Sequence, residues 1–200
     1  MDTEYRTKTG WLCLDFANTV EWHASENPVE TLNTYADLIE WSVNRGIVSA
    51  DAKDGLLRKS EEKPVEAQAV LGKAREARED IYGILSDTAH GKPVRTSELR
   101  GFNKALVSAL SHSRLAPHEG RLKWEWDFRS ERLDSVMWPV VRSAVDLMTS
   151  EAIKRVGQCA DERGCGWLFW DSSRNRSRRW CDMSDCGNRA KVRRFYARKR

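Results

Sequence analysis

The sequence predicts an α+β fold, in which a mainly helical domain with a small amount of strand (residues 1–157) precedes a small cysteine-rich module (residues 158–200). Three observations support this division. Apolar residues at helical spacing dominate the first three quarters of the chain. Four of the five cysteines lie in the last 42 residues. Hydrophobic residues make up 40% of the sequence and include nine Trp, which is enough to build a core.

Most of the first domain has the apolar periodicity of helices. Helices are predicted over residues 31–45, 49–60, 64–91, 98–112, 135–148 and 149–156. Gly46 is a good C-terminal capping residue for the first of these helices, Ser49 is a candidate N-cap for the second, and Pro64 opens the third. Thr96 or Ser97 caps the fourth. The apolar stretch over residues 10–22 fits a helix or a strand equally well, so its type stays open.

One segment of the first domain has the periodicity of a strand. Between residues 121 and 128, Leu122, Trp124, Trp126 and Phe128 alternate with charged residues. Alternation with a period of two is typical of a strand that is buried on one face only. The sequence does not identify the partner of this strand.

The charge of the chain is distributed unevenly. Residues 151–200 hold 14 Lys and Arg against 6 Asp and Glu, a net charge of +8, whereas residues 1–150 have a net charge of −4. This distribution is expected of a basic module that contacts a polyanion. The sequence has no apolar run of about 18 residues and no secretory signal, which favours a soluble, cytoplasmic protein without a membrane partner.

The four clustered cysteines predict a metal site. Cys159, Cys165, Cys181 and Cys186 follow the spacing C-x5-C-x15-C-x4-C. In a reducing compartment, two close pairs of thiols favour one tetrahedral zinc ion, with two disulfides or four unrelated thiols as the alternatives. Four thiolates close the coordination sphere, so the zinc is expected to be structural. Because the sequence also has no Ser/His/Asp order and no phosphate-binding glycine loop, we expect no enzymatic activity.

The segments between the cysteines predict a treble-clef or zinc-ribbon-like module. Residues 166–171 form a short strand and residues 178–181 a returning strand, which together make a hairpin. Ser184 is a candidate N-cap that would place Cys186 in the first turn of the last helix. An apolar stripe of this helix is expected to pack on the hairpin; it consists of Val192, Phe195 and Tyr196.

The basic residues of the module predict a nucleic-acid interface, because Arg and Lys neutralise phosphates and displace counterions. The candidate contacts are Arg174, Arg176, Arg178, Arg179, Asn188, Arg189, Lys191, Arg193, Arg194 and Arg198. DNA is favoured over RNA. An RNA-binding zinc ribbon is the first alternative, since aromatic residues beside arginines suit stacking on unpaired bases. A basic tail that binds an acidic protein is the second.

Polar residues in the amino-terminal apolar stretch are candidates for an effector pocket. Asp15, Asn18, Glu21 and His23 lie in or beside this stretch. Such residues are more often caps and satisfied hydrogen-bonding groups. In a third hypothesis, the first domain binds a small molecule or acts as an enzyme, and the zinc module is a structural clasp. The sequence does not decide whether the protein forms a homodimer, because it contains no heptad pattern that would predict one.

The stretch Cys186-Gly187-Asn188-Arg189, with "GCGWLFWDSSRNRSRRWC" before it and "AKVRRFYARKR" after it, closely resembles the CGNR zinc-finger family. The stretch "LCLDFANTV" (12–20) is similar to the start of an ABATE-type domain, which this finger typically follows. The resemblance implies that the four cysteines bind the metal. It also implies a bacterial, stress-induced transcription regulator that binds DNA through the finger.

Overall fold

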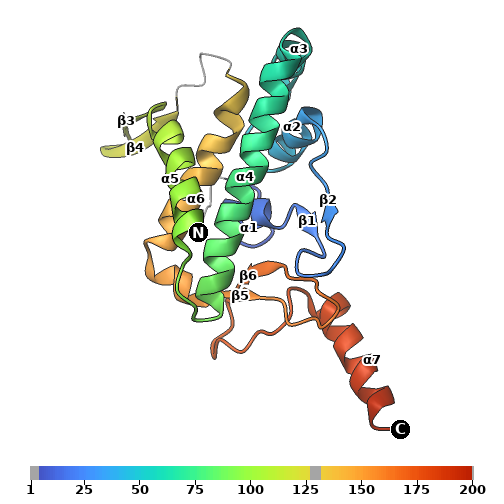
Figure 1. Ribbon diagram of the computed structural model, residues 1–200. Helices are drawn as coiled ribbons and strands as arrows, with labels where there is room; N and C mark the ends of the chain where they lie inside the picture. The colour runs from blue at the N-terminus through green and yellow to red at the C-terminus, as the bar shows by residue number, and fades with distance from the viewer. Residues whose placement is uncertain (1–4, 127–131, 200) are drawn as a thin grey trace.

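The computed structural model describes residues 5–126 and 132–199. In the first domain, short and long helices surround the central helix α4, and the cysteine-rich module lies at one end of this bundle (Figure 1). The helices of the domain are α1 (Leu12–Ala17), α2 (Tyr35–Asn44), α3 (Ala50–Glu62), α4 (Pro64–Ala89), α5 (Thr96–Leu110) and α6 (Trp138–Met148). Short 3-10 helices η2 (Leu133–Met137) and η3 (Glu151–Arg155) flank α6. No helix within the described residues is both long and apolar enough to cross a membrane.

The amino-terminal apolar stretch, whose type the sequence leaves open, is a helix followed by a short strand. All six residues of α1 are buried, and the helix packs against α4 and α6. Strand β1 (Val20–Glu21) then pairs antiparallel with β2 (Val29–Glu30). Residues 11–20 are all buried, which explains the high apolar content of this segment.

Most of the helices predicted for the first domain are confirmed, with differences of up to four residues at their ends, and the exception is the last one. The Ser49 hydroxyl accepts a hydrogen bond from the amide of Ala52, as expected for an N-cap. Pro64 occupies the first turn of α4. Thr96 is the first residue of α5 and Arg95 precedes it, so the cap predicted at Thr96 or Ser97 is wrong. Residues 149–156, predicted as a short helix, form a 3-10 turn and the start of a strand.

The strand predicted over residues 121–128 is present as β4 (Arg121–Trp126), and residues 127 and 128 lie outside the described part of the chain. Its partner is β3 (Ser113–His118), which precedes it in a hairpin with Leu115 opposite Trp124. The prediction of one buried face is wrong. Leu122 is 69% exposed and Trp124 38% exposed, because the hairpin projects from the helical bundle instead of covering it (Figure 1).

The hairpin predicted within the cysteine-rich module is also wrong. Strand β6 (Leu168–Trp170) pairs antiparallel with β5 (Val156–Gln158), which precedes the module, and residues 178–181 form no strand. The loop between β6 and residues 178–181 explains why these two segments do not pair. The buried carboxylate of Asp171 accepts hydrogen bonds from the amides of Ser173 and Arg178, so the chain closes a compact loop before it reaches Cys181.

The module ends in a π-helical turn, η4 (Met183–Gly187), and the helix α7 (Asn188–Ala197). The carboxylate of Asp182 accepts a hydrogen bond from the amide of Ser184, so Asp182 caps this segment and the cap predicted at Ser184 is wrong. Helix α7 has no buried residue and projects away from the rest of the molecule (Figure 1). Its predicted apolar stripe therefore does not pack on the module: Val192, Phe195 and Tyr196 are each more than half exposed.

Candidate metal centre and nucleic-acid interface

The structure brings the four predicted cysteine ligands together. The sulfur atoms of Cys159, Cys165, Cys181 and Cys186 all lie within 4.8 Å of one another. The Sγ atoms of Cys165 and Cys186 are each 3.6 Å from the Sγ atom of Cys181, and all four thiols are free. Tetrahedral zinc with bonds of about 2.3 Å separates its sulfur ligands by about 3.8 Å, whereas a disulfide joins them at about 2.0 Å. The geometry therefore fits one structural zinc ion and excludes the alternative of two disulfides.

Each cysteine reaches the cluster from a different backbone segment. Cys159 directly follows β5, and its amide donates to the carbonyl of Trp167. Cys165 stands between Gly164 and Gly166, whose φ angles are +86° and +68°. A Cβ atom at either glycine would come within about 2.7 Å of the backbone at Ala24 or Ser25. The two glycines therefore allow a tight turn and also a close approach to the first domain.

The four thiols alter one another's pKa values. Hydrogen bonds from Cys165 and Cys181 to its sulfur lower the pKa of Cys159, so this thiol ionises readily. The same hydrogen bonds with Cys159 raise the pKa of Cys165 and Cys181, and burial raises the pKa of Cys186. Four thiolates at this spacing repel one another, and a bound divalent cation supplies the charge that keeps all four deprotonated.

Hydrogen bonds join the inner part of the module to the first domain. The side chain of Asn18 accepts from the amide of Leu168 and donates to its carbonyl, both at 2.8 Å. The amide of His23 donates to the carbonyl of Cys165. Leu168 is fully buried in the same core as α1 and α4. The inner strand of the finger is thus part of the core of the first domain.

Helix α4 supports the same junction from the other side. The hydroxyl of Tyr82 donates to the carbonyl of Gly166 at 2.9 Å, and its ring stacks on the imidazole of His23 at 3.5 Å between centroids. The side-chain nitrogen Nε2 of Gln158 donates to the Tyr82 oxygen, and its side-chain oxygen Oε1 accepts from the hydroxyl of Ser86. The centre of the finger is consequently held in place by residues more than 70 positions earlier in the chain.

Arg189, predicted to contact nucleic acid, is largely occupied inside the molecule. Its guanidinium donates to the Cys186 sulfur at 2.7 Å and to the carboxylate of Asp161, whose side chain is fully buried. It also forms an ion pair with Asp185 and lies over the ring of Trp22 at 5.2 Å. Arg189 therefore connects a metal ligand to the first domain, and its predicted role as a nucleic-acid contact remains untested.

Arg193 has a similar arrangement one turn further along α7. It forms ion pairs with Asp161 at 3.1 Å and with Glu162 at 3.0 Å. Burial alone would raise the pKa of Asp161, but hydrogen bonds from the Arg163 amide and the Arg189 guanidinium hold it below its ordinary value. The ionised Asp161 thus anchors the start of α7 to the segment after Cys159.

The remaining predicted cations are exposed, and two of them surround one aromatic ring. The guanidiniums of Arg179 and Arg194 lie over Trp180, at 5.1 Å and 5.6 Å from its centroid. These residues line a groove of about 240 Å³ that runs between the loop before Cys181 and α7. Cation–π contacts hold both guanidiniums in place while their outer edges remain in solvent. We call the groove lined by Arg179, Trp180 and Arg194 the Arg–Trp–Arg groove.

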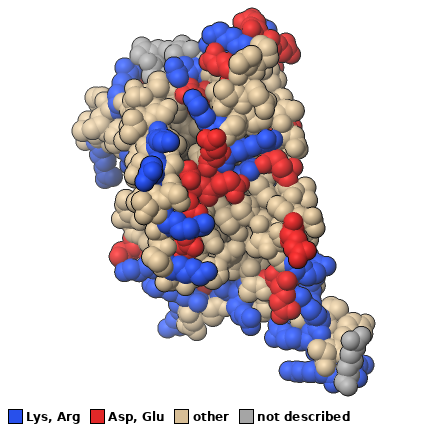
Figure 2. All heavy atoms as spheres, in the orientation of Figure 1, with Lys and Arg blue, Asp and Glu red and all other residues tan. Residues whose placement is uncertain are grey.

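The other predicted nucleic-acid contacts lie on the outer surface of the module. Arg174 and Arg176 are exposed on the loop that Asp171 closes, and Asn188, Lys191 and Arg198 are exposed on α7 or at its end. Arg178 packs over Phe169 and donates to the carbonyls of Trp180 and Cys181. Figure 2 shows Lys and Arg side chains gathered over this end of the molecule.

The four residues predicted to line an effector pocket do not share one role. Asp15 accepts hydrogen bonds from the amides of Lys8 and Thr9 and pairs with Arg45 at 2.9 Å. Asn18 and His23 form the junction with the finger, and His23 also contacts Glu79 at 2.9 Å. Glu21 is exposed on β1. Asp15, Asn18 and His23 have structural partners, and an effector role for these four residues remains a prediction.

Comparison with known families agrees with this arrangement. A family model named ABATE, described as "Putative stress-induced transcription regulator", matches residues 10–151. The chain belongs to the ABATE family. The model of the CGNR zinc finger matches residues 155–199, which contain all four clustered cysteines. The ABATE domain and the finger thus account for most of the chain. No curated protein matches the sequence.

Sequence reasoning found the metal ligands but missed the residues that hold them. Trp22 and Tyr82 contact the finger from the first domain, Asp161 lies within the finger, and no motif marks any of the three. Trp22 has a positive φ angle of 55° and lies under both Arg163 and Arg189. A large aromatic residue in this conformation is rare, but the sequence carries no signal for it.

Proposed function

We propose that this ABATE protein is a DNA-binding transcription regulator that contacts the DNA backbone through the outer surface of its zinc finger. The Arg–Trp–Arg groove is the observation that carries the proposal. It presents two guanidiniums, from Arg179 and Arg194, on a rigid aromatic support beside the exposed helix α7. Planar guanidiniums bind phosphate oxygens through two parallel hydrogen bonds.

The distribution of free and occupied cations supports a contact with phosphates. Arg189 and Arg193 are paired with carboxylates near the metal, whereas Lys191 and Arg198 are exposed and have no ion pair within the described residues. Free cations on a metal-ordered scaffold neutralise phosphates without first breaking internal ion pairs. The proposal therefore assigns phosphate binding to the outer cations and structural support to Arg189 and Arg193.

The proposal gives the metal a structural role. Four thiolates leave no coordination position for water or substrate, so the zinc orders the module and does not act as a Lewis acid. A reducing cytoplasm is a compartment in which thiols remain free to bind metal. We accordingly propose that the protein is cytoplasmic and has no enzymatic activity.

RNA is the second candidate, and it rests on a different observation. Phe195 and Tyr196 are exposed on α7, at 55% and 64% of their surface. Exposed aromatic rings beside cations stack on unpaired bases, which duplex DNA does not offer. Competition between duplex DNA and single-stranded RNA for the zinc-loaded protein separates the two candidates.

The test of the proposal is the salt dependence of DNA binding. The affinity of the zinc-loaded protein for duplex DNA is expected to fall steeply as salt rises, because each phosphate contact releases about 0.9 counterion. Replacing Arg179 and Arg194 with Ala removes two contacts and reduces the slope of log K against log salt by about two. The matched control is Arg58→Ala on α3, an exposed arginine far from the finger, which leaves the slope unchanged. An affinity that does not depend on salt would refute the proposal.

A further inference from the structure

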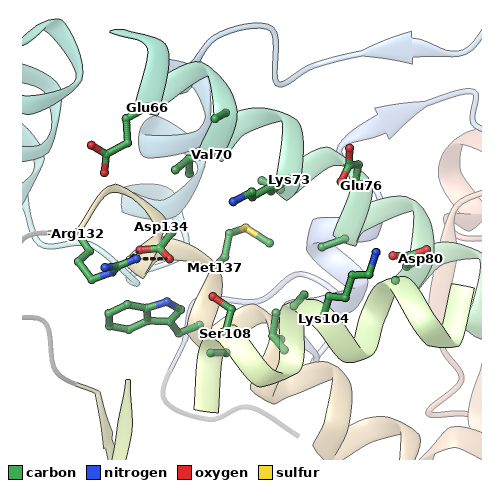
Figure 3. A pocket seen from close by; sticks show the side chains of 18 residues that line it. Glu66, Val70, Lys73, Glu76, Asp80, Lys104, Ser108, Arg132, Asp134 and Met137 are labelled. Carbon is green, nitrogen blue, oxygen red and sulfur yellow. Dashed lines mark hydrogen bonds and ion pairs between the residues drawn. The ribbon is translucent and has the colours of Figure 1, made fainter. Parts of the chain in front are cut away.

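A cavity of about 620 Å³ lies between α4, α5 and the segment that leads from η2 into α6 (Figure 3). This volume is within the range of about 300–1,000 Å³ that is typical of small-molecule sites. Its floor is apolar and includes Val70, Ala77, Ala105, Met137 and Val141, and the indole of Trp138 lies at one end. An apolar floor of this size provides binding energy for the hydrocarbon part of a ligand.

The rim of the cavity carries more acids than bases. Glu66, Glu76, Asp80 and Asp134 face the cavity together with Lys73, Lys104 and Arg132. Arg132 and Asp134 neutralise each other through an ion pair at 2.9 Å. Within the described part of the chain, neither Glu76 nor Asp80 forms an ion pair or hydrogen bond. Figure 2 shows acidic side chains gathered along the furrow between α4 and α5.

Asp80 is the residue that best defines the polar end of the cavity. Burial and the neighbouring Glu76 raise its pKa above the ordinary value, and Lys104 only partly offsets this effect. Its carboxylate lies against Gly101 of α5, where a Cβ atom would come within 2.1 Å of the Asp80 oxygen. Glycine at position 101 therefore leaves room for a half-buried carboxylate at this end of the cavity.

We propose that this cavity binds a small amphipathic organic cation, with its apolar body on the floor formed by α4, α5 and α6 and its charged nitrogen at Glu76 and Asp80. A cation at this end would form the ion pair that Glu76 and Asp80 lack within the described residues, and the apolar floor suits an alkylated body. The proposal is independent of nucleic-acid binding. Helix α4 nevertheless belongs to both sites, since Tyr82 and Ser86 contact the finger from the same helix.

The first experiment compares two probes with the same ring system and opposite charge. Rhodamine 6G is a cationic xanthene dye, and fluorescein is an anionic one. Titration of the zinc-loaded full-length protein into each dye is expected to raise the fluorescence anisotropy of rhodamine 6G at micromolar protein and to leave that of fluorescein unchanged. Equal binding of both dyes, stronger binding of fluorescein at Lys73 and Lys104, or no binding of rhodamine 6G would overturn the proposal.

The second experiment locates the bound dye. Asp80→Asn keeps the shape of the side chain and removes its charge, so the affinity for rhodamine 6G is expected to fall about fivefold. Glu76→Gln is expected to have a similar effect, and it tests the same point if Asp80→Asn does not fold. Glu61→Gln removes an exposed carboxylate of α3 outside the cavity and leaves the affinity unchanged. An equal loss in all three variants, or no loss at Asp80 and Glu76, would place the dye elsewhere and refute the assignment.

Discussion

The inner and outer halves of the zinc finger are held in different ways. The inner half, residues 156–170, contributes the fully buried Leu168 to the core and receives hydrogen bonds from Asn18 and Tyr82. The outer half, residues 178–199, ends in a helix with no buried residue. Two of the metal ligands belong to the inner half and two to the outer half. The metal centre is therefore the boundary between a part that the core orders and a part that the metal orders.

This difference shows how a small module combines rigidity with an accessible surface. A segment of about 40 residues buries too little apolar area to fold alone. Here the first domain supplies the missing contacts for one half, and zinc supplies them for the other together with the ion pairs of Arg189 and Arg193 to Asp161. The outer half can then leave its cations and aromatic rings in solvent, because its order does not depend on burying them.

Loss of a metal ligand is expected to have the largest effect and to separate the two halves. Cys186→Ser removes an outer ligand, so zinc content should fall from one per chain to near zero, as measured by elemental analysis. The binding free energy of structural zinc in isolated finger peptides is about 10–16 kcal/mol. The few contacts of α7 are too weak to compensate for its loss. Cys13→Ala is the control, because Cys13 is buried in the first domain away from the cluster. One zinc per chain in Cys186→Ser would show that the ligand set is wrong.

Loss of the Asn18 side chain tests the attachment of the inner half. Asn18→Ala leaves the buried amide and carbonyl of Leu168 without partners, which costs about 2–4 kcal/mol. For a chain of this length the melting temperature is expected to fall by about 5–15 °C, while zinc content stays at one per chain. Asn27→Ala on the exposed loop should change the melting temperature by less than about 2 °C. A similarly small change in Asn18→Ala would contradict the account of the junction.

Substitution of Arg189 tests the metal centre, which lies between the two halves of the finger. Arg189→Ala removes the hydrogen bond to the Cys186 sulfur and the ion pair with Asp161, and it is expected to weaken zinc binding about 10–100-fold. Competition with a chromogenic chelator measures this affinity. Arg198→Ala, at the exposed end of α7, leaves it unchanged. If Arg189→Ala instead weakened only DNA binding at saturating zinc, Arg189 would belong to the interface and not to the metal centre.

The exposed aromatic residues of α7 are expected to have the smallest effect. Replacing Phe195 and Tyr196 with Ala should change the stability by no more than about 0.5 kcal/mol, because both rings already lie in solvent. Affinity for duplex DNA should change less than about threefold, as measured by fluorescence anisotropy. A loss of about 1–3 kcal/mol per ring that is confined to single-stranded RNA would favour the RNA-binding alternative.

The sequence predicts the metal centre well because its signal is local. Four cysteines in two close pairs, with glycines on both sides of Cys165, indicate the site without knowledge of the rest of the fold. The helices of the first domain are predictable for the same reason, since capping residues such as Ser49 and Pro64 act within one turn.

Contacts between distant segments are not predictable in this way. Strand β6 has the composition of a strand, but nothing in it indicates that β5 and not residues 178–181 is its partner. Helical periodicity places Val192 and Phe195 on one face of α7, but it does not reveal whether another surface covers that face. The half-buried position of Arg189 likewise depends on Trp22 and Asp161, which lie 167 and 28 residues earlier.

The most direct test of the account is hydrogen exchange of the full-length protein with zinc and after its removal by a chelator. The amides of α7 and of the turn before it are expected to lose their protection when zinc is removed, whereas those of β6 and α4 keep theirs. This result would show that zinc orders the outer half and the core orders the inner half. Equal loss of protection in β6 and α7, or unchanged protection in α7, would contradict the division of the finger at its metal centre.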